Sequence, residues 1–245
     1  MRSKGPVNSI EQFRDFWETC HKIESVTHLS GAQYDPAMGS LKIEERIRPG
    51  TNVLEVGVGM GYITQGLQQK GAKVSALDIS QTALDRVNKY CEEVYLIEDM
   101  GKIPSDHFDV IVCCNMVQHV HTDLLKQELG HFIRSLADGG VLALQFVSNN
   151  VHHDMGAEAT LAAVQSGILC RSPQFMKDRI EELGGQCEHV VNTEGLRKGK
   201  VNGNHVFHVT KKSEEPKKKK KDKKDKNNPS AQIRSGMGYD NPHDY

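Results

Sequence analysis

Short apolar runs and helical periodicities alternate along most of this chain. The apolar runs lie at residues 51–56, 73–79, 94–97, 108–114 and 141–147. Between them, apolar positions recur every three or four residues at 62–70, 80–92 and 123–137. Short apolar runs predict buried strands, and the longer periodic segments predict amphipathic helices. Strands that alternate with helices in this order predict a parallel sheet with right-handed crossovers.

The pattern changes near the end of the alternating region. A helix is predicted from Pro173 to the glycine pair Gly184-Gly185, and strands are predicted at 187–192 and 204–210. The segment between these strands is rich in Gly, Lys and Asn, so they should pair as an antiparallel hairpin. We therefore predict an α/β fold with three layers: a doubly wound, mostly parallel seven-stranded sheet that ends in an antiparallel hairpin.

The N-terminal region follows a different pattern. Residues 8–24 carry an apolar stripe that includes Trp17, which predicts a helix. We expect residues 1–39 to form a helical lid or cap. Tyr34-Asp35-Pro36 predicts a turn within it, and a short helix should follow at 40–48.

The remaining chain divides into a main domain, an insertion and a tail. We expect the main domain to span 40–212, and residues 148–172 break its rhythm as an insertion. Residues 213–245 are rich in Lys and then in Asn, Pro, Ser and Gly, so they are predicted to be disordered. A polyanion-binding or nuclear-import role for these lysines stays open.

The net charge of −1 hides a segregation of charge. Residues 211–226 carry +6, whereas residues 1–210 carry −6. An acidic body makes nucleic acid an unlikely partner for the main domain. The six cysteines form no Cys-x-x-Cys pair, which is typical of free thiols in a reducing compartment. No signal-peptide pattern and no run of 18 apolar residues occur, so we expect a cytoplasmic protein without a membrane partner.

The strand predicted at 51–56 ends in a glycine motif, Glu55-x-Gly57-x-Gly59-x-Gly61. Glycines allow positive φ and a close approach of a ligand to the backbone. A dinucleotide fingerprint would need glycine at Tyr62, and a P-loop would need Gly-Lys-Ser/Thr, so both are excluded. The motif resembles the first motif of the class I S-adenosylmethionine (SAM)-dependent methyltransferases, and the resemblance covers roughly residues 40–210.

The resemblance implies a SAM site whose product is S-adenosylhomocysteine. Asp78 ends the second strand, where it would accept hydrogen bonds from the ribose hydroxyls. Asp99 would bind the adenine amino group and Met100 would pack on the adenine ring. Glu55 would lie near the methionine ammonium. The expected cofactor-binding residues are Glu55, Gly57, Gly59, Gly61, Asp78, Ile79, Asp99, Met100 and Asn115.

Two histidines follow the fourth strand, in the stretch that lies beside the transferred methyl in this family. His119 is the predicted catalytic or acceptor-contacting residue, and His121 is a second candidate. The Asn-Pro-Pro-Tyr signature of amino-directed enzymes and the paired acids of metal-dependent catechol enzymes are absent. We therefore predict a metal-free transfer of methyl to a small-molecule acceptor, with a hydroxyl oxygen as the leading target and a histidine as the base.

Several alternatives stay open at this point. Methyl transfer to nitrogen, sulfur or arsenic is one, and a SAM-binding regulator without activity is another. A nucleic-acid methyltransferase recruited by the Lys-rich tail is a third. His152-His153-Asp154 in the insertion lacks further ligands for a metal site, so we expect no metal. Arg171 is expected either to meet an acidic group of the acceptor or to be a surface charge.

Overall fold

A computed structural model describes residues 10–23, 33–120, 122–148, 169–192 and 203–212. The chain divides into two units, Met1–Lys212 and Ser213–Tyr245, and all described residues belong to the first. The predicted tail, His121, His152 and His153 therefore lie outside the described residues. Within this part of the chain, no helix combines the length and apolar character that a bilayer crossing requires.

The described residues form a seven-stranded sheet in the order β3-β2-β1-β4-β5-β7-β6. The strands β1 to β5 are parallel, and β7 is antiparallel to both β5 and β6. The predicted fold class is thus confirmed, including the final hairpin. The strands are β1 (Asn52–Val56), β2 (Lys73–Asp78), β3 (Glu93–Leu96), β4 (Phe108–Cys113), β5 (Leu136–Ser148), β6 (Gly185–Asn192) and β7 (Gly203–Lys211).

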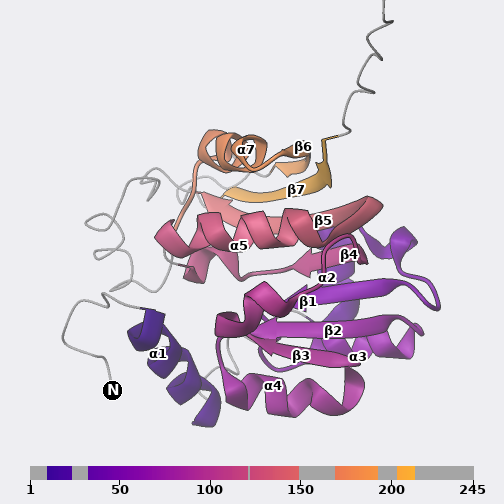
Figure 1. Cartoon of the computed structure of the whole chain (residues 1–245), viewed down its shortest axis with the longest axis vertical. Helices are drawn as coiled ribbons and strands as arrows, with labels where there is room; N and C mark the ends of the chain where they lie inside the picture. Colours follow the sequence, from indigo (N-terminus) through magenta and orange to yellow (C-terminus); the bar gives the residue numbers. More distant parts are fainter. Residues whose placement is uncertain (1–9, 24–32, 121, 149–168, 193–202, 213–245) are drawn as a thin grey trace, which may run out of the picture. The chain divides into compact units, whose positions relative to one another are not determined.

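Helices cover both faces of this sheet (Figure 1). One face packs against α5 (Thr122–Ser135) and α7 (Pro173–Glu182). The other packs against α2 (Tyr34–Leu41), α3 (Tyr62–Gln69) and α4 (Gln81–Val87). A further helix, α1 (Ile10–Lys22), contacts α4. Short 3-10 turns are η2 (Glu44–Arg46), η3 (Asn88–Tyr90), η4 (Ile97–Lys102) and η5 (Val117–His119).

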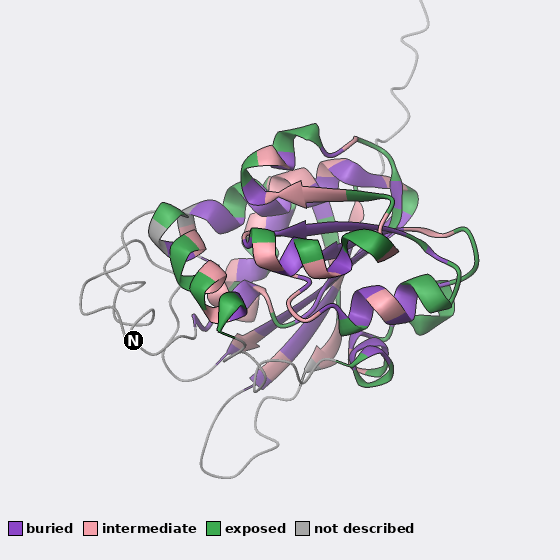
Figure 2. Ribbon diagram, turned by 90° about the horizontal axis from the view of Figure 1, so that it is seen from below, coloured by how far each residue is buried: buried purple, intermediate pink, exposed green. Residues whose placement is uncertain are grey.

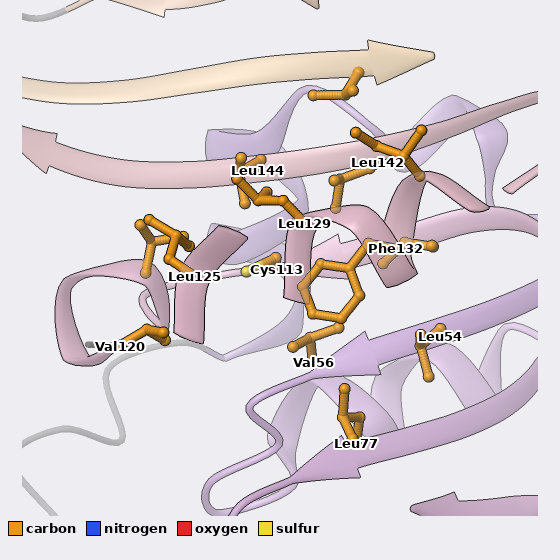
Figure 3. Close-up of a cluster of buried hydrophobic side chains, with 14 of the residues drawn as sticks. Leu54, Val56, Leu77, Cys113, Val120, Leu125, Leu129, Phe132, Leu142 and Leu144 are labelled. Atoms are coloured by element: carbon orange, nitrogen blue, oxygen red, sulfur yellow. The ribbon is translucent and has the colours of Figure 1, made fainter. Parts of the chain in front are cut away.

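The central strands are buried on both faces, as parallel strands between two helix layers must be (Figure 2). Figure 3 shows how α5 contributes to this core. Its Leu125, Leu129 and Phe132 point toward Leu54, Val56, Leu77, Cys113, Leu142 and Leu144 of the strands. These α5 residues recur at three- and four-residue steps, so the periodicity that predicted the helix also predicted its buried face.

The N-terminal expectations were partly wrong. Tyr34-Asp35-Pro36 forms the first turn of α2, because proline fits the first turn of a helix, where its missing N–H costs nothing. The helix expected at 40–48 is only the 3-10 turn η2. The fifth strand begins earlier than predicted, at Leu136. It contains Gly139 at φ +73°, beside a register shift opposite Phe108 and Val110.

Candidate active site

The strand order reverses between β1 and β4, because β2 and β3 lie on one side of β1 and β4 and β5 on the other. Ligands of such sheets bind at the carboxyl edge of this switch point. Four of the loops that leave this edge carry predicted site residues. They are the glycine turn after β1, the loop after β2, the turn η4 after β3 and the turn η5 after β4. The structure therefore brings the predicted residues that it describes to one edge of the sheet.

The three glycines of the motif all have positive φ, at +76° for Gly57, +54° for Gly59 and +80° for Gly61. Their surroundings differ. A Cβ at Gly57 would lie 2.8 Å from Cγ of Met116, and one at Gly61 would lie 2.6 Å from Cγ1 of Val87. A Cβ at Gly59 would meet no atom within 4 Å. Two of the glycines therefore allow close packing, whereas Gly59 faces open space.

Asp78 ends β2 beside this turn. One carboxylate oxygen accepts a 3.3 Å hydrogen bond from the N–H of Gly59, and the other accepts a 2.9 Å bond from the N–H of Ser80. Only 7% of Asp78 is exposed. Burial raises the pKa of Asp78, while these N–H groups and the nearby His21 oppose the rise. Because a carboxylate has about four acceptor positions, Asp78 keeps capacity for a ligand hydroxyl.

Glu55 lies beneath the turn and is almost fully buried. Its Oε2 accepts a 2.5 Å hydrogen bond from the hydroxyl of Thr64 in α3. Burial raises the pKa of Glu55 to about 8, against the effect of the Thr64 bond and with that of the Asp78 charge. Glu55 is therefore mostly protonated at neutral pH, and a bound cation would favour its ionised form.

The residues after β3 differ in exposure. Asp99 is half-buried in η4 and pairs with Lys102 at 2.8 Å. Met100 is buried in the core cluster that includes Leu77, and Ile79 packs against the same cluster. Met100 and Ile79 thus form part of the wall of the sheet edge, while Asp99 reaches the surface.

Asn115 follows β4 in a left-handed conformation, with φ +55°. Asparagine tolerates this conformation better than most residues. Its N–H donates to Oε1 of Gln145 at 3.3 Å, and its Oδ1 accepts from Gln118 at 3.4 Å. The chain is therefore held in a sharp turn where the fourth strand ends, next to His119.

His119 is half-buried at the end of η5. Its ring packs against that of Trp17 from α1, with centroids 4.8 Å apart and planes at 70°. The same helix contributes His21, which is 5% exposed and whose Nδ1 accepts a 3.2 Å hydrogen bond from Nη1 of Arg86. Burial lowers the pKa of His21, and the charge of Asp78 opposes this.

Sequence reasoning missed most of these α1 contacts. Glu18 accepts hydrogen bonds from the hydroxyls of Ser80 and Thr82, each at 2.6 Å. The apolar stripe of residues 8–24 includes Phe13, Phe16, Trp17 and Ile23, of which Phe16 and Ile23 are exposed. The pattern thus predicted a buried face only in part, and it did not identify the loops that this face contacts.

One of the two interpretations of Arg171 drawn from the sequence, that it is a surface charge, is wrong. It is fully buried, so it is not a surface charge. Its Nη2 donates to the carbonyl of Val120 at 2.9 Å, and its N–H donates to the carbonyl of Val147. This residue therefore ties the end of β5 to the loop that carries His119.

Among the described residues, no group of three or more His, Cys, Asp or Glu side chains is arranged to hold a metal ion. A cavity of about 350 Å³ opens at the amino edge of the sheet, lined by residues such as Arg46, Thr51 and Asp109. Because parallel sheets bind their ligands at the carboxyl edge, this cavity is not the candidate site.

A family profile described as a methyltransferase domain matches residues 30–190, which is more than half of the chain. The chain belongs to this methyltransferase family. The family and the enzyme class predicted from the glycine motif are thereby confirmed, and methyltransferases of this family use SAM.

Curated relatives of this methyltransferase include a ubiquinone biosynthesis O-methyltransferase from Azoarcus sp., 34% identical over 49% of this chain and 54% of the relative. Another, from Actinobacillus pleuropneumoniae, is 30% identical over 66% of this chain and 73% of the relative. The chain spans about half or less of the length of most curated relatives that it matches.

Among solved structures, the methyltransferase is similar to the Burkholderia thailandensis 1,6-didemethyltoxoflavin N1-methyltransferase, which holds its acceptor and S-adenosylhomocysteine. The TM-score is 0.60 at 14% identity, and the similarity covers 86% of this chain and 94% of that one. At this identity the similarity shows the shared fold.

Proposed function

We propose that this methyltransferase transfers the methyl group of SAM to a hydroxyl oxygen of a small-molecule acceptor. The observation that carries the proposal is the pairing of Asp78 with the glycine turn. The N–H of Gly59 fixes the Asp78 carboxylate at the end of β2, and the space beside Gly59 is open. A carboxylate beside a backbone that a ligand can approach closely suits a nucleoside with free ribose hydroxyls.

The other predicted residues complete this cofactor site. Asp99 would accept from the adenine amino group, with Met100 and Ile79 as the apolar wall beneath it. Glu55 would offset the positive charge of the methionine ammonium, and the backbone at Asn115 would contact the same part of the cofactor. Gly57 and Gly61 would keep the turn close enough to Met116 and Val87 for the site to retain its shape.

SAM supplies an activated methyl group on a positively charged sulfur. The chain's own contribution is then alignment, which can be worth on the order of 7–11 kcal/mol. A hydroxyl acceptor must also lose its proton. We assign this step to His119, whose imidazole nitrogen would take the proton, and a positioned base contributes roughly 10²–10⁴-fold. His121 remains a second candidate outside the described residues.

Several curated relatives are named as ubiquinone biosynthesis O-methyltransferases, and these names support oxygen as the target. In this proposal α1 forms the lid over the site, whereas α2 packs on a face of the sheet. Residues 148–172 are proposed to contact the acceptor, and most of them lie outside the described residues. The Lys-rich residues 213–245, which lie outside the described residues, are proposed as a contact for polyanions. We also propose a cytoplasmic location, which is supported by the absence of a disulfide among the six cysteines, all of which lie in the described residues.

The test uses methyl-labelled SAM with three acceptor pools: a deproteinised small-metabolite extract, total protein and RNA. We expect label in the small-metabolite pool, and NMR of the product would identify the methylated atom. The Asp78→Asn variant should lose this transfer. Asp85→Asn is the matched control, because it removes the same charge from an exposed position on α4.

Each other outcome has a defined meaning. Label on nitrogen, sulfur or arsenic in the product would replace the hydroxyl acceptor. Label in RNA or protein would make the Lys-rich tail a recruitment segment. Binding of SAM without transfer to any pool would favour a regulator without activity.

A further inference from the structure

The helix α1 contacts three of the loops that leave the carboxyl edge of the sheet. Arg14 pairs with Glu98 in η4, after β3. Glu18 binds the loop after β2, and Trp17 packs on His119 after β4. In Figure 1, α1 lies at the side of the sheet where these strands end. One helix therefore joins the loops predicted to bind the cofactor to the loop that carries the predicted base.

Glu18 is the anchor of this helix. Its carboxylate accepts bonds from the hydroxyls of Ser80 and Thr82 and a 3.2 Å bond from the N–H of Thr82. These groups form the N-terminus of α4, where backbone donors lack partners within the helix. Partial burial raises the pKa of Glu18, but these bonds outweigh it and hold the pKa at about 2. Glu18 is thus ionised at every physiological pH.

The anchor sits next to the predicted ribose site. Ser80 donates its backbone N–H to Asp78 and its hydroxyl to Glu18, so the two carboxylates bind different groups of the same residue. One helical turn after Trp17, His21 is held by Arg86, whose Nη2 donates to the His21 carbonyl at 2.6 Å. The end of α1 is therefore fixed to α4 by two independent contacts.

Trp17 is one residue before the anchor and is half-buried. Its indole contacts the ring of His119 nearly edge to face, which is a geometry that aromatic pairs prefer. This packing restricts the rotation of the His119 ring. The neighbouring Phe16 is 45% exposed, so the inward position of Trp17 is specific to that side of the helix.

We propose that Trp17 is a positioning residue for His119. Glu18 fixes the position of Trp17, because its hydrogen bonds hold α1 against the N-terminus of α4. The inference rests on the proposed function, because it takes His119 as the base. It adds that the imidazole is aligned only while α1 is docked on the loop that holds the ribose. The acceptor side of the site then depends on the integrity of the cofactor side.

A double-mutant cycle tests the positioning role. The initial rate of label transfer to the small-metabolite extract is measured against SAM concentration for the native chain, Trp17→Leu, His119→Gln and the double variant. We expect Trp17→Leu to lower the rate at saturating SAM by at least about tenfold, because small misplacements are costly in catalysis. The KM for SAM should change much less. In the His119→Gln background, Trp17→Leu should have almost no further effect.

Two variants separate positioning from a loss of structure. Trp17→Phe keeps an aromatic ring against His119 and should recover most of the rate. Glu18→Gln keeps the shape of the anchor but loses its charge, and should reproduce the loss seen for Trp17→Leu. Asp15→Asn is its matched control, since Asp15 is exposed on the same helix and should leave the rate unchanged.

Additive losses for Trp17→Leu and His119→Gln in an active protein would overturn this inference alone. Unchanged transfer by His119→Gln would overturn it together with the assignment of the base. A native chain that transfers no label to the extract would overturn the proposed function, and the inference with it.

Discussion

The hydroxyl of Thr64 donates a 2.5 Å hydrogen bond to the carboxylate of Glu55, and both groups are buried under the glycine turn. This bond links the end of β1 to the first turn of α3. It also stabilises the ionised form of Glu55, but less than burial opposes it, so the pKa of Glu55 rests at about 8. Glu55, the predicted ligand of the methionine ammonium, therefore carries a proton at neutral pH in the free protein.

The raised pKa predicts that SAM binding releases a proton. Below about pH 8 the free protein holds Glu55 protonated, whereas the bound cation favours the carboxylate. The complex therefore binds fewer protons, and SAM affinity should rise with pH up to about 8, by at most about tenfold per pH unit. Calorimetry in buffers of different ionisation enthalpy measures the released proton.

Glu55→Gln is the control for this linkage. It cannot ionise, so the Glu55 part of the pH dependence should vanish while the part from Asp78 remains, since burial raises that pKa as well. Equal pH dependence in Glu55→Gln and the native chain would contradict the assignment to Glu55.

The open space beside Gly59 predicts a variant that folds but does not bind SAM. An alanine at φ +54° costs roughly 1–2 kcal/mol of stability, and its Cβ would enter the space proposed for the cofactor. We expect SAM affinity to fall by at least about tenfold, measured by equilibrium binding of labelled SAM.

Gly50→Ala is the matched control for Gly59→Ala. Gly50 has φ +86° and also meets no atom within 4 Å, but it precedes β1 at the opposite edge of the sheet. It should lose similar stability and keep its affinity for SAM. A parallel loss of affinity in both variants would mean that backbone strain, and not the filled space, weakens binding.

The sequence predicted the strands and their ends well, because apolar runs and glycine turns are local signals. Asp78 and Asn115 were placed correctly at the ends of β2 and β4 for this reason. The contacts of Trp17 and Glu18 with residues distant in the sequence were not predictable from periodicity, which shows a buried face but not its neighbour. Arg171 was misjudged in part because a single charged residue gives no periodic signal of burial.

Gly66 is another residue whose role sequence reasoning missed. It lies within α3, where its missing side chain admits Tyr34, and an added Cβ would lie 2.3 Å from Cγ of that ring. Gly66→Ala should lower the free energy of unfolding by about 1–3 kcal/mol through overpacking, despite the better helix propensity of alanine. Urea unfolding measures the change.

Gly39→Ala gives the opposite expectation. Gly39 is an exposed position within α2, and an added Cβ would meet no atom within 4 Å. The variant should gain up to about 1 kcal/mol of stability from helix propensity alone. A stabilising effect of Gly66→Ala would show that Tyr34 does not pack on α3 as described.

Glu128 predicts a pH-dependent loss of stability within the core. It is 3% exposed on α5, and its Oε2 has no hydrogen-bond partner among the residues that the structure describes. Burial raises its pKa from 4.5 to about 8. Between these values the folded chain holds a proton that the unfolded chain has lost. The free energy of unfolding should therefore fall as pH rises through this range, by about 1.4 kcal/mol per pH unit.

Glu128→Gln removes this titration and isolates it from that of Glu55, which both proteins share. Urea unfolding at pH 5, 6, 7 and 8 should show the variant gaining stability relative to the native chain at each step. Glu92→Gln, an exposed change of the same kind, should follow the native curve. If the Glu128→Gln curve also ran parallel to the native one, Glu128 would have an ordinary pKa in the folded chain and a partner that stabilises its charge.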